Sequence, residues 1–411
     1  MSKLKRNLTA VLFLLGIGAG LVVAITAFFS GSGNLRAEFG KVRRDFSYLP
    51  TFLSGAENAL NQDLDKDHHF IQLYGGIQRL MGRRVVEDVE ADYTVIKLDN
   101  GDLAFENLYG GATDTRPHAQ AVADFQEQLA EKDIPLLYVQ APQKVSQSGD
   151  ELPEGVTDYG HENTDLLLST LNDLGVDTLD LRPVLEEASQ APGALPFYFR
   201  TDHHWTPEGG FVGYQAVTER LSEILGYEVD PIHTDPDSYT KITYEDSFLG
   251  SQGKRVGTLY TGVDSINLWK PNFETSFTYS VPLNAIERTG PFEESLLFPE
   301  RVEEIDYFNG NPYTLYAGGD YNLARMTNHL NPDGPRVLLI RDSFSCILAP
   351  FLALDCSELI TIDLRYFKDN LMDYMDWLDP DMVVVMYCAS STRLPELFQF
   401  FGADTKPEFR Y

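Results

Sequence analysis

Short apolar runs alternate with amphipathic segments over most of this chain, and that alternation limits the fold more than any other feature. The runs that we predict to be strands are residues 134–140, 176–181, 336–344, 358–364 and 381–388. Runs of this length that are largely apolar and end at turn residues are typical of parallel strands buried on both faces.

Amphipathic patterns separate these strands. They cover residues 116–132, 163–175, 206–226 and 373–378. Thr206 and Pro207 are a favourable N-cap and first-turn pair, and Gly175 is a favourable helix stop. Strands that alternate with helices predict an α/β domain whose parallel sheet has helices on both faces.

Residues 227–335 break this alternation. They contain short alternating runs such as FTYSVPL and NPYTLYAGG, with many Tyr, Thr, Gly and Asn residues. A period of two is the pattern of half-buried strands. We therefore predict a mostly β insertion or lid at 227–335, between a first part of the α/β domain at 89–226 and a second part at 336–411.

The start of the chain has the pattern of a membrane anchor. An uncharged apolar stretch from Leu8 to Phe29 follows Lys3, Lys5 and Arg6. About 22 helical residues are enough to cross a hydrocarbon core of roughly 30 Å. We expect residues 1–30 to be a cytoplasmic head and a transmembrane signal anchor, with a cleaved signal peptide as the alternative. The expected location is the cell membrane, as a single-pass protein with its C-terminal domain outside the cell.

Two further elements are predicted between the anchor and the α/β domain. Residues 31–88 are expected to be a juxtamembrane helical connector. The alternating segment 89–108 contains Asp99-Asn100-Gly101. Asn-Gly between two apolar runs is the strongest short signal for a β-hairpin, so we predict a hairpin there.

Charge and cysteine content restrict the class of protein. The chain has 62 Asp and Glu against 32 Lys and Arg, which gives a formal net charge of -30. This balance argues against nucleic-acid binding, and it suits a solvated acidic surface or a partner that is a neutral sugar. The three cysteines are Cys346, Cys356 and Cys388. They lie in apolar surroundings, so we expect buried free thiols, with one disulfide as the alternative.

Two polar clusters far apart in the sequence have the residue types of a nucleophilic site. Asp202, His203 and His204 lie just before the helix predicted at 206–226, and Ser343 follows the apolar run RVLLI. Ligand sites of α/β proteins form at the carboxyl ends of parallel strands, where Ser343 is expected. A serine hydroxyl becomes a nucleophile when a base takes its proton. We predict Ser343 as nucleophile, His204 as base and Asp202 as the partner that orients the base.

Other interpretations of these clusters stay open. His203 competes with its neighbour for the role of base or orienting group, and Ser345 is a second candidate nucleophile. Asp342 and Ser343 can instead cap the helix that follows the strand.

A metal site is a further alternative at the Asp-His-His cluster. Asp202, His203 and His204 all carry groups that can bind a metal ion. No run of Cys or His supplies the remaining ligands at the usual spacing, so we predict neither a metal nor any other cofactor.

The two clusters resemble a known family. FYFRTDHHWTPEGG and LLIRDSFS resemble the DHHW protein family of Gram-positive bacteria and the SGNH-hydrolase-like domains of the alginate O-acetyltransferases. The resemblance spans roughly residues 55–400. Supporting fragments are APQK at 141–144, LDLRPVL at 179–185, FLGSQGKRVG at 248–257 and YAGGDYN at 316–322. In those relatives the Asp-x-His element precedes the serine, which is a circularly permuted order compared with ordinary SGNH hydrolases.

The resemblance implies an SGNH-hydrolase-like sheet and the roles already given to Ser343, His204 and Asp202. Arg341 departs from the pattern, because it stands where SGNH hydrolases usually have the Gly of Gly-Asp-Ser. It can narrow the site or offer a positive charge to a substrate. Candidate residues for substrate or oxyanion contact are Arg341, Lys144, Tyr316, Gly318, Gly319 and Asn322. Ordinary packing and an ordinary turn are the alternatives for the last five.

The resemblance also implies a function. We expect a membrane-anchored extracellular acyltransferase or esterase that acts on O-acetyl groups of a cell-surface polysaccharide. A transferase of this kind needs a multi-span membrane partner, because a single-pass chain cannot carry a cytoplasmic acyl donor across the bilayer. The alternative is a non-catalytic module that binds a glycan or a partner in a cell-envelope assembly.

Overall fold

The computed structural model describes residues 33–48, 68–105 and 111–402, with Val11, Leu14, Gly18 and Gly55. The chain divides into two compact units, 1–74 and 75–411. Helices α2 (Gly33–Arg44) and η1 (Phe46–Tyr48) belong to the first unit. In the described part of the chain, no helix is both long and apolar enough to cross a membrane. The anchor predicted at 8–29 lies outside the described residues, apart from three isolated positions.

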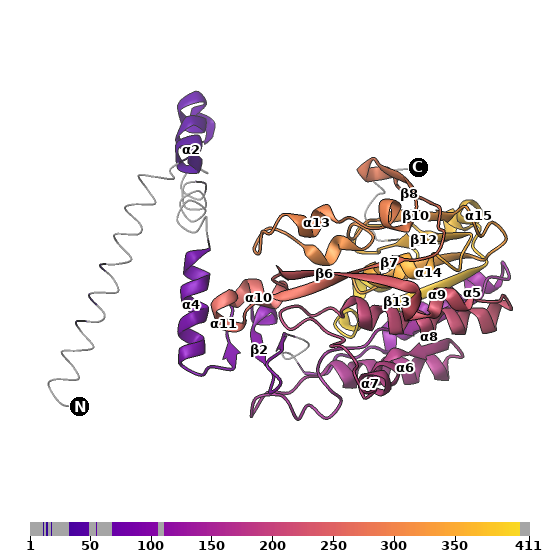
Figure 1. Ribbon diagram of the computed structural model, residues 1–411, viewed down its shortest axis with the longest axis horizontal. Helices are drawn as coiled ribbons and strands as arrows, with labels where there is room; N and C mark the ends of the chain where they lie inside the picture. Colours follow the sequence, from indigo (N-terminus) through magenta and orange to yellow (C-terminus); the bar gives the residue numbers. More distant parts are fainter. Residues whose placement is uncertain are drawn as a thin grey trace. The chain divides into compact units, whose positions relative to one another are not determined.

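An eight-stranded sheet forms the centre of the second unit (Figure 1). Its strands follow the order β5-β4-β13-β11-β12-β10-β8-β9. The bounds are β4 (Leu136–Gln140), β5 (Asp177–Asp180), β8 (Phe277–Val281), β9 (Ile286–Gly290), β10 (Leu323–Asn328), β11 (Arg336–Arg341), β12 (Glu358–Ile362) and β13 (Met382–Tyr387). The five strands from β5 to β12 are parallel, as the apolar runs predict.

Helices cover both faces of this sheet. The elements on one face are α7 (Leu181–Ser189), α8 (Pro207–Leu225) and α14 (Ser345–Leu352). Those on the other face are α5 (Arg116–Ala130), α6 (Gly160–Asp173), η6 (Leu371–Tyr374), α15 (Met375–Leu378) and η8 (Pro395–Phe398). Leu137 and Val139 of β4 pack into the first core, whereas Leu136 and Tyr138 pack into the second. The mixed α/β fold with a large sheet and helices therefore agrees with the prediction.

Part of the segment 227–335, predicted to be a mostly β insertion or lid, belongs to the main sheet. Its strands β8, β9 and β10 continue the large sheet by antiparallel pairing, because β10 pairs with β12 on one side and with β8 on the other. Phe277, Tyr279 and Val281 alternate along β8 and are fully buried in the core beneath α14. The alternating sequence pattern of this segment thus comes from strands at one end of the main sheet.

The rest of this segment forms a β-ribbon and short helices. Strands β6 (Tyr239–Phe248) and β7 (Asp264–Pro271) pair in an antiparallel two-stranded sheet (Figure 1). The short helices are α9 (Pro231–Thr234), η3 (Pro236–Ser238), α10 (Ser251–Val256), α11 (Thr258–Thr261), η4 (Pro282–Asn284), α12 (Phe292–Ser295), α13 (Glu300–Glu303) and η5 (Pro312–Leu315), and η7 (Ser391–Arg393) follows β13.

A small sheet precedes the α/β domain. It contains β1 (Val85–Val86), β2 (Val95–Lys97) and β3 (Leu103–Ala104), with η2 (Ala91–Tyr93) between β1 and β2, and it follows α4 (His69–Leu80). Strands β2 and β3 pair antiparallel around a turn in which Gly101 has a φ of 94°. The hairpin predicted at Asp99-Asn100-Gly101 is therefore confirmed. The three cysteines are buried free thiols, also as predicted.

Candidate active site

Ser343 lies in a turn at the carboxyl end of the central strand β11. Strand β11 ends at Arg341, and the Asp342 carboxylate then fixes the turn. Asp342 Oδ1 accepts the Phe344 N–H at 3.0 Å, and Oδ2 accepts the Cys388 N–H and the Ser391 hydroxyl, both at 2.7 Å. These bonds join the turn to the end of the neighbouring parallel strand β13. Asp342 therefore braces the turn and leaves the Ser343 hydroxyl for another partner.

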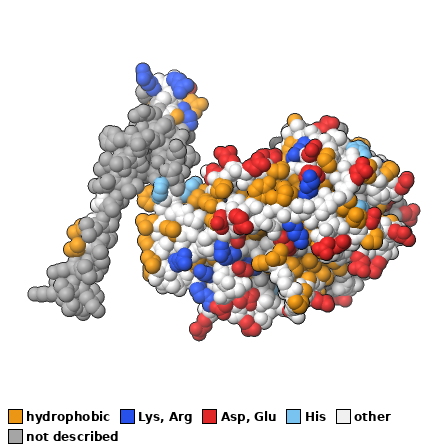
Figure 2. Space-filling view, viewed as in Figure 1, with side chains coloured by type: hydrophobic (Ala, Val, Ile, Leu, Met, Phe, Trp, Pro, Cys, Tyr) orange, Lys and Arg blue, Asp and Glu red, His pale blue; other side chains and the backbone are white. Residues whose placement is uncertain are grey.

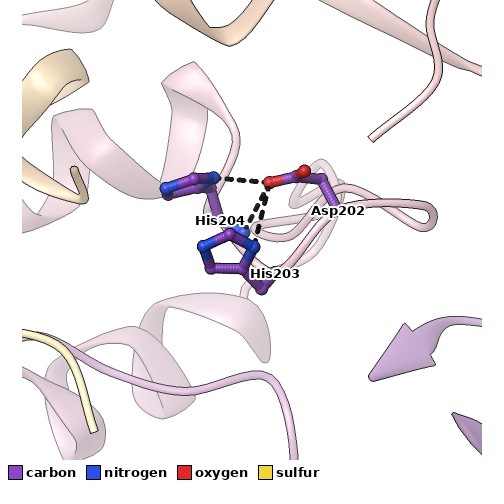
Figure 3. A group of neighbouring side chains, drawn as sticks. All are labelled: Asp202, His203 and His204. Atoms are coloured by element: carbon purple, nitrogen blue, oxygen red, sulfur yellow. Dashed lines mark hydrogen bonds and ion pairs between the residues drawn. The ribbon is translucent and has the colours of Figure 1, made fainter. Parts of the chain in front are cut away.

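That partner is His204. The Nε2 atom of His204 is 2.7 Å from Ser343 Oγ, and its Nδ1 atom is 2.5 Å from Asp202 Oδ1. The second contact is drawn in Figure 3. An ionised carboxylate can only accept, so the Nδ1 proton is donated to Asp202 and Nε2 is left to accept from the serine hydroxyl. The structure brings together the three side chains for which the sequence predicts a nucleophilic site.

The Asp202 carboxylate is buried and fully hydrogen-bonded. Oδ1 also accepts the His204 main-chain N–H at 3.0 Å, and Oδ2 accepts the Ser251 N–H at 2.6 Å. Burial alone would raise the pKa of Asp202, but the two neighbouring imidazoles and these hydrogen bonds outweigh it and hold the pKa well below its usual value. The carboxylate is therefore charged over the physiological range, so it can accept the Nδ1 proton of His204.

Aromatic groups pack on the His204 ring. The Tyr313 ring stacks on it with centroids 3.8 Å apart and an interplanar angle of 15°. The Tyr313 hydroxyl donates to the carbonyl oxygens of Ser343 and Phe344, at 3.0 and 3.1 Å. Tyr313 thus contacts both the His204 ring and the turn that carries Ser343. The sequence analysis missed it, and its only signal was an aromatic residue in the run NPYTLY.

His203 is directed to a different partner. Its Nδ1 atom is 2.8 Å from the Ser251 hydroxyl and 3.7 Å from Asp202 Oδ1. Burial and the neighbouring His204 lower the pKa of His203 to about 3. The ring is therefore neutral at physiological pH, and it lies beside His204 without a hydrogen bond to Ser343 among the described residues.

The Asp202-His203-His204 group has the residue types of a metal site. Its ligand atoms all lie within 4.8 Å of one another (Figure 3). Both Asp202 oxygens already accept N–H groups, and His204 Nδ1 already faces one of them. An added cation would have to displace these hydrogen bonds. The donor set fits the orientation of a base better than it fits a metal ion.

Tyr316 lies inside the protein and does not match the prediction of a substrate contact, whereas the ammonium of the buried Lys144 is engaged by the main chain. The Lys144 ammonium donates to three main-chain carbonyls, those of Leu103 at 2.8 Å, Phe199 at 2.5 Å and Asp202 at 2.5 Å. The Tyr316 side chain is fully buried, and its hydroxyl joins the main chain of β7. Carbonyls from distant segments converge on Lys144, which the sequence could not show.

Arg341 is also buried, at 1% exposure, and does not present its charge to a substrate. The guanidinium forms an ion pair with Asp320 and donates to the Gly319 carbonyl at 2.8 Å. Burial alone would lower the pKa of Arg341, but the neighbouring Cys346 and Asp320 raise it. Arg341 therefore holds the 318–320 loop against the strand that carries Ser343, and this corrects both expectations for it.

The remaining candidates have local roles in the described residues. Gly318 and Gly319 have φ of 73° and 132°, which favours glycine, and the carbonyl oxygens of both accept side-chain hydrogen bonds. Asn322 Oδ1 accepts the Leu323 N–H at 2.7 Å. The Ser345 hydroxyl is buried without a hydrogen-bond partner among the described residues. Ser345 is thus shielded from substrate, unlike the half-buried Ser343.

The α/β sheet with Ser343, His204 and Asp202 at its carboxyl edge fits an SGNH-hydrolase-like domain, and two family models match parts of the chain. The model of the SGNH hydrolase-like domain of acetyltransferase AlgX matches residues 106–235, and the model of the DHHW protein matches residues 194–361. The resemblance inferred from the two motifs is confirmed. Over these ranges the chain is similar to the SGNH hydrolase-like domain of AlgX and to the DHHW protein.

Individual relatives agree with these matches. The alginate biosynthesis protein AlgX of Pseudomonas aeruginosa is 26% identical over 138 residues, which are 32% of this chain and 28% of AlgX. The chain thus matches little more than a quarter of the length of that relative.

Two solved structures share the fold. A DHHW family protein from Eubacterium siraeum has a TM-score of 0.58 at 19% identity, with 78% of this chain and 99% of that chain covered. Bacillus cereus PatB1 has a TM-score of 0.60 at 21% identity, with 74% and 99% covered.

Proposed function

We propose that this chain is a serine-dependent acyltransferase or esterase that acts on O-acetyl groups of a cell-surface polysaccharide. The observation that carries the proposal is the unbroken hydrogen-bonded line from Ser343 Oγ through His204 to Asp202, at 2.7 and 2.5 Å. The match to the SGNH hydrolase-like domain of acetyltransferase AlgX supports acetyl groups as the transferred unit.

The proposed reaction follows from these three side chains. His204 Nε2 takes the hydroxyl proton of Ser343 while Oγ attacks the ester carbonyl carbon. The tetrahedral intermediate then expels the alcohol, which receives the proton from His204, and an acyl group stays on Ser343. A sugar hydroxyl or a water molecule loses a proton to His204, attacks the acyl group and restores the free serine. Asp202 stabilises the imidazolium in both half-reactions.

The negative oxygen of the intermediate needs hydrogen-bond donors. The main-chain N–H of Ser343 makes no hydrogen bond to another group in the described part of the chain. It is next to the attacking oxygen, so we assign it as one oxyanion donor. A single donor of this kind lowers the barrier by about 3–4 kcal/mol in studied enzymes.

The membrane assignment is part of the proposal. We propose that residues 8–29 anchor the chain, with the C-terminal domain outside the cell. A transferase would then receive its acyl group from a multi-span membrane partner. Labelling of an epitope tag after Tyr411 in intact cells tests the orientation, because only an outside terminus reacts with an impermeant reagent before lysis.

The test of the function uses the full-length chain in a mild detergent. We expect hydrolysis of 4-nitrophenyl acetate by the wild type and a fall of about 10³-fold or more in Ser343→Ala, since the nucleophile is lost. Ser345→Ala is the matched control, because Ser345 lies two residues away and is buried. Equal rates for wild type and Ser343→Ala would remove Ser343 as nucleophile and favour the non-catalytic glycan-binding or partner-binding module.

A further inference from the structure

A cavity of about 600 Å³ lies apart from the three residues of the candidate site. Its walls are the loop 142–147 after β4, residues 182–189 of α7, the segment 196–198 and single residues from the hairpin and α6. Asp202, His204 and Ser343 do not line it. A cavity of this volume is in the range of small-molecule sites.

The cavity opens at the same edge of the sheet as Ser343. Its walls follow the carboxyl ends of β4 and β5, and β11 is two strand positions from β4 and three from β5. Parallel strands are about 4.8 Å apart, so the strand that carries Ser343 is roughly 10–14 Å from these walls. An oligosaccharide of a few residues spans this distance.

The lining has the chemistry of a site for sugars. Phe197 and Tyr198 give aromatic surface that can contact the apolar face of a sugar ring. Amides and carboxyls that can exchange hydrogen bonds with hydroxyl groups come from Asn100, Gln143, Gln147, Asp102 and Glu186. Burial raises the pKa of Asp102, and its Oδ2 accepts the Asn100 side-chain N–H at 3.2 Å. Gln143 Oε1 has no hydrogen-bond partner among the described residues.

The basic groups of the lining are already engaged. Arg182 pairs with Asp180 at 2.8 Å and with Asp165 at 2.7 Å, and it also contacts His161 Nδ1. The other nitrogen of His161 faces the Val145 carbonyl at 2.8 Å. The Lys144 ammonium donates to three carbonyls. A uronate carboxylate in this cavity would therefore meet carboxyl groups and no uncommitted cation among these residues.

We propose that this cavity is a subsite for neutral sugar residues of the acceptor, and that the glycan chain continues from it along the sheet edge to Ser343. The inference rests on the proposed function, and it names the substrate class as a neutral polysaccharide. The acidic side chains spread over the surface in Figure 2, and the net charge of -30, also disfavour a polyuronate.

The test is a binding titration by calorimetry with the full-length Ser343→Ala chain, in which turnover is blocked. The probes are cellotetraose and chitotetraose as neutral oligosaccharides and tetragalacturonate as the acidic one. We expect at least one neutral probe to bind, and tetragalacturonate to bind at least tenfold more weakly. Glu186→Arg should reduce this preference at least tenfold, because it places a free cation in the lining. Glu187→Arg is the matched control, since Glu187 is an exposed neighbour outside the lining.

Failure of this subsite is distinguishable from failure of the proposed function. If neither neutral probe binds, if tetragalacturonate binds equally well, or if Glu186→Arg and Glu187→Arg behave alike, the subsite is overturned even when the wild type turns over acetyl esters. If a neutral probe binds with the expected dependence on Glu186 while the wild type shows no turnover, the subsite stands and the catalytic proposal falls.

Discussion

Replacement of Lys144 by Met tests how the Asp202 turn is held. The Lys144 side chain is buried, at 9% exposure, and its ammonium donates to the carbonyls of Leu103, Phe199 and Asp202. The Lys144 ammonium thus holds together three segments: the hairpin, the segment before the site and the turn that contains Asp202. Met keeps most of the apolar stem and removes all three donors.

The expected loss follows from those three hydrogen bonds. A buried acceptor left without a partner costs about 1–3 kcal/mol, and a hydrogen bond to a charged donor contributes about 1.5–3 kcal/mol. Three carbonyls without a partner would cost at least about 3 kcal/mol of folding free energy. The variant no longer buries a charged ammonium, and this gain offsets part of the cost. We expect the free energy of unfolding to fall by about 3–5 kcal/mol, and kcat to fall as well because Asp202 is no longer fixed.

The assay is urea unfolding of the full-length chain, followed by tryptophan fluorescence. Lys132→Met is the matched control, because Lys132 forms an exposed ion pair with Asp376. Such a pair contributes about 0–1 kcal/mol. In addition, Lys144→Ala should regain activity in the presence of propylammonium ions, which can bring an ammonium group to the three carbonyls. If Lys144→Met lowers the free energy of unfolding by less than about 1 kcal/mol, as Lys132→Met does, the three hydrogen bonds of Lys144 do not hold the turn as proposed.

Three further predictions concern groups around the base. Burial and the neighbouring imidazole lower the pKa of His203 to about 3. The unfolded chain, with a pKa near 6.5, therefore binds this proton first as the pH falls, and stability declines by about 1.4 kcal/mol per pH unit between pH 6 and 4. His203→Gln should flatten that decline in urea unfolding at pH 6 and pH 4.5. Gly250→Ala puts a Cβ 2.2 Å from the Asp202 Cβ, so we expect a loss of about 1–3 kcal/mol in stability and a fall in kcat. Tyr313→Phe keeps the stacked ring and removes the donor to the Ser343 carbonyl, which should cost about 1–2 kcal/mol and lower kcat in ester hydrolysis.

Each of these has a contradicting result. An unchanged slope with pH in His203→Gln would mean that another group titrates. Gly76→Ala is the control for Gly250, since the Cβ added there meets its nearest atom at 3.5 Å. Equal stability and kcat in the two alanine variants would contradict the close approach to Asp202. An unaltered kcat in Tyr313→Phe would limit Tyr313 to packing on the imidazole.

The parallel part of the sheet was predictable because its strands are apolar on both faces. Residues 336–341 and 382–387 bury both alternating sets of side chains, and continuous apolar runs record that arrangement directly. Strands β8 to β10 were harder. An alternating strand such as 277–281 has the same pattern in a separate β-ribbon as at the end of a large sheet, so pattern alone does not show the partner strand.

The sequence predicted those members of the candidate site whose side chains carry a distinctive chemical group. Asp202 and His204 are two positions apart, and Ser343 follows a strand, so local sequence points to all three. The partners of Lys144 and Arg341 could not be predicted from the sequence. Carbonyls from distant segments accept the N–H groups of Lys144, and Asp320 pairs with Arg341. Only the tertiary structure shows such partners.

An acyl-enzyme measurement tests the role of Ser343 most directly. The full-length chain is mixed with 4-nitrophenyl acetate, quenched in acid within the first turnover and digested, and the peptide that contains Ser343 is examined by mass spectrometry. We predict an acetyl group on Ser343 in the wild type, and strongly reduced acetylation in His204→Ala because the base is absent. An unmodified Ser343 in a preparation that hydrolyses the ester, or the same labelling with and without His204, would contradict the proposed nucleophilic site.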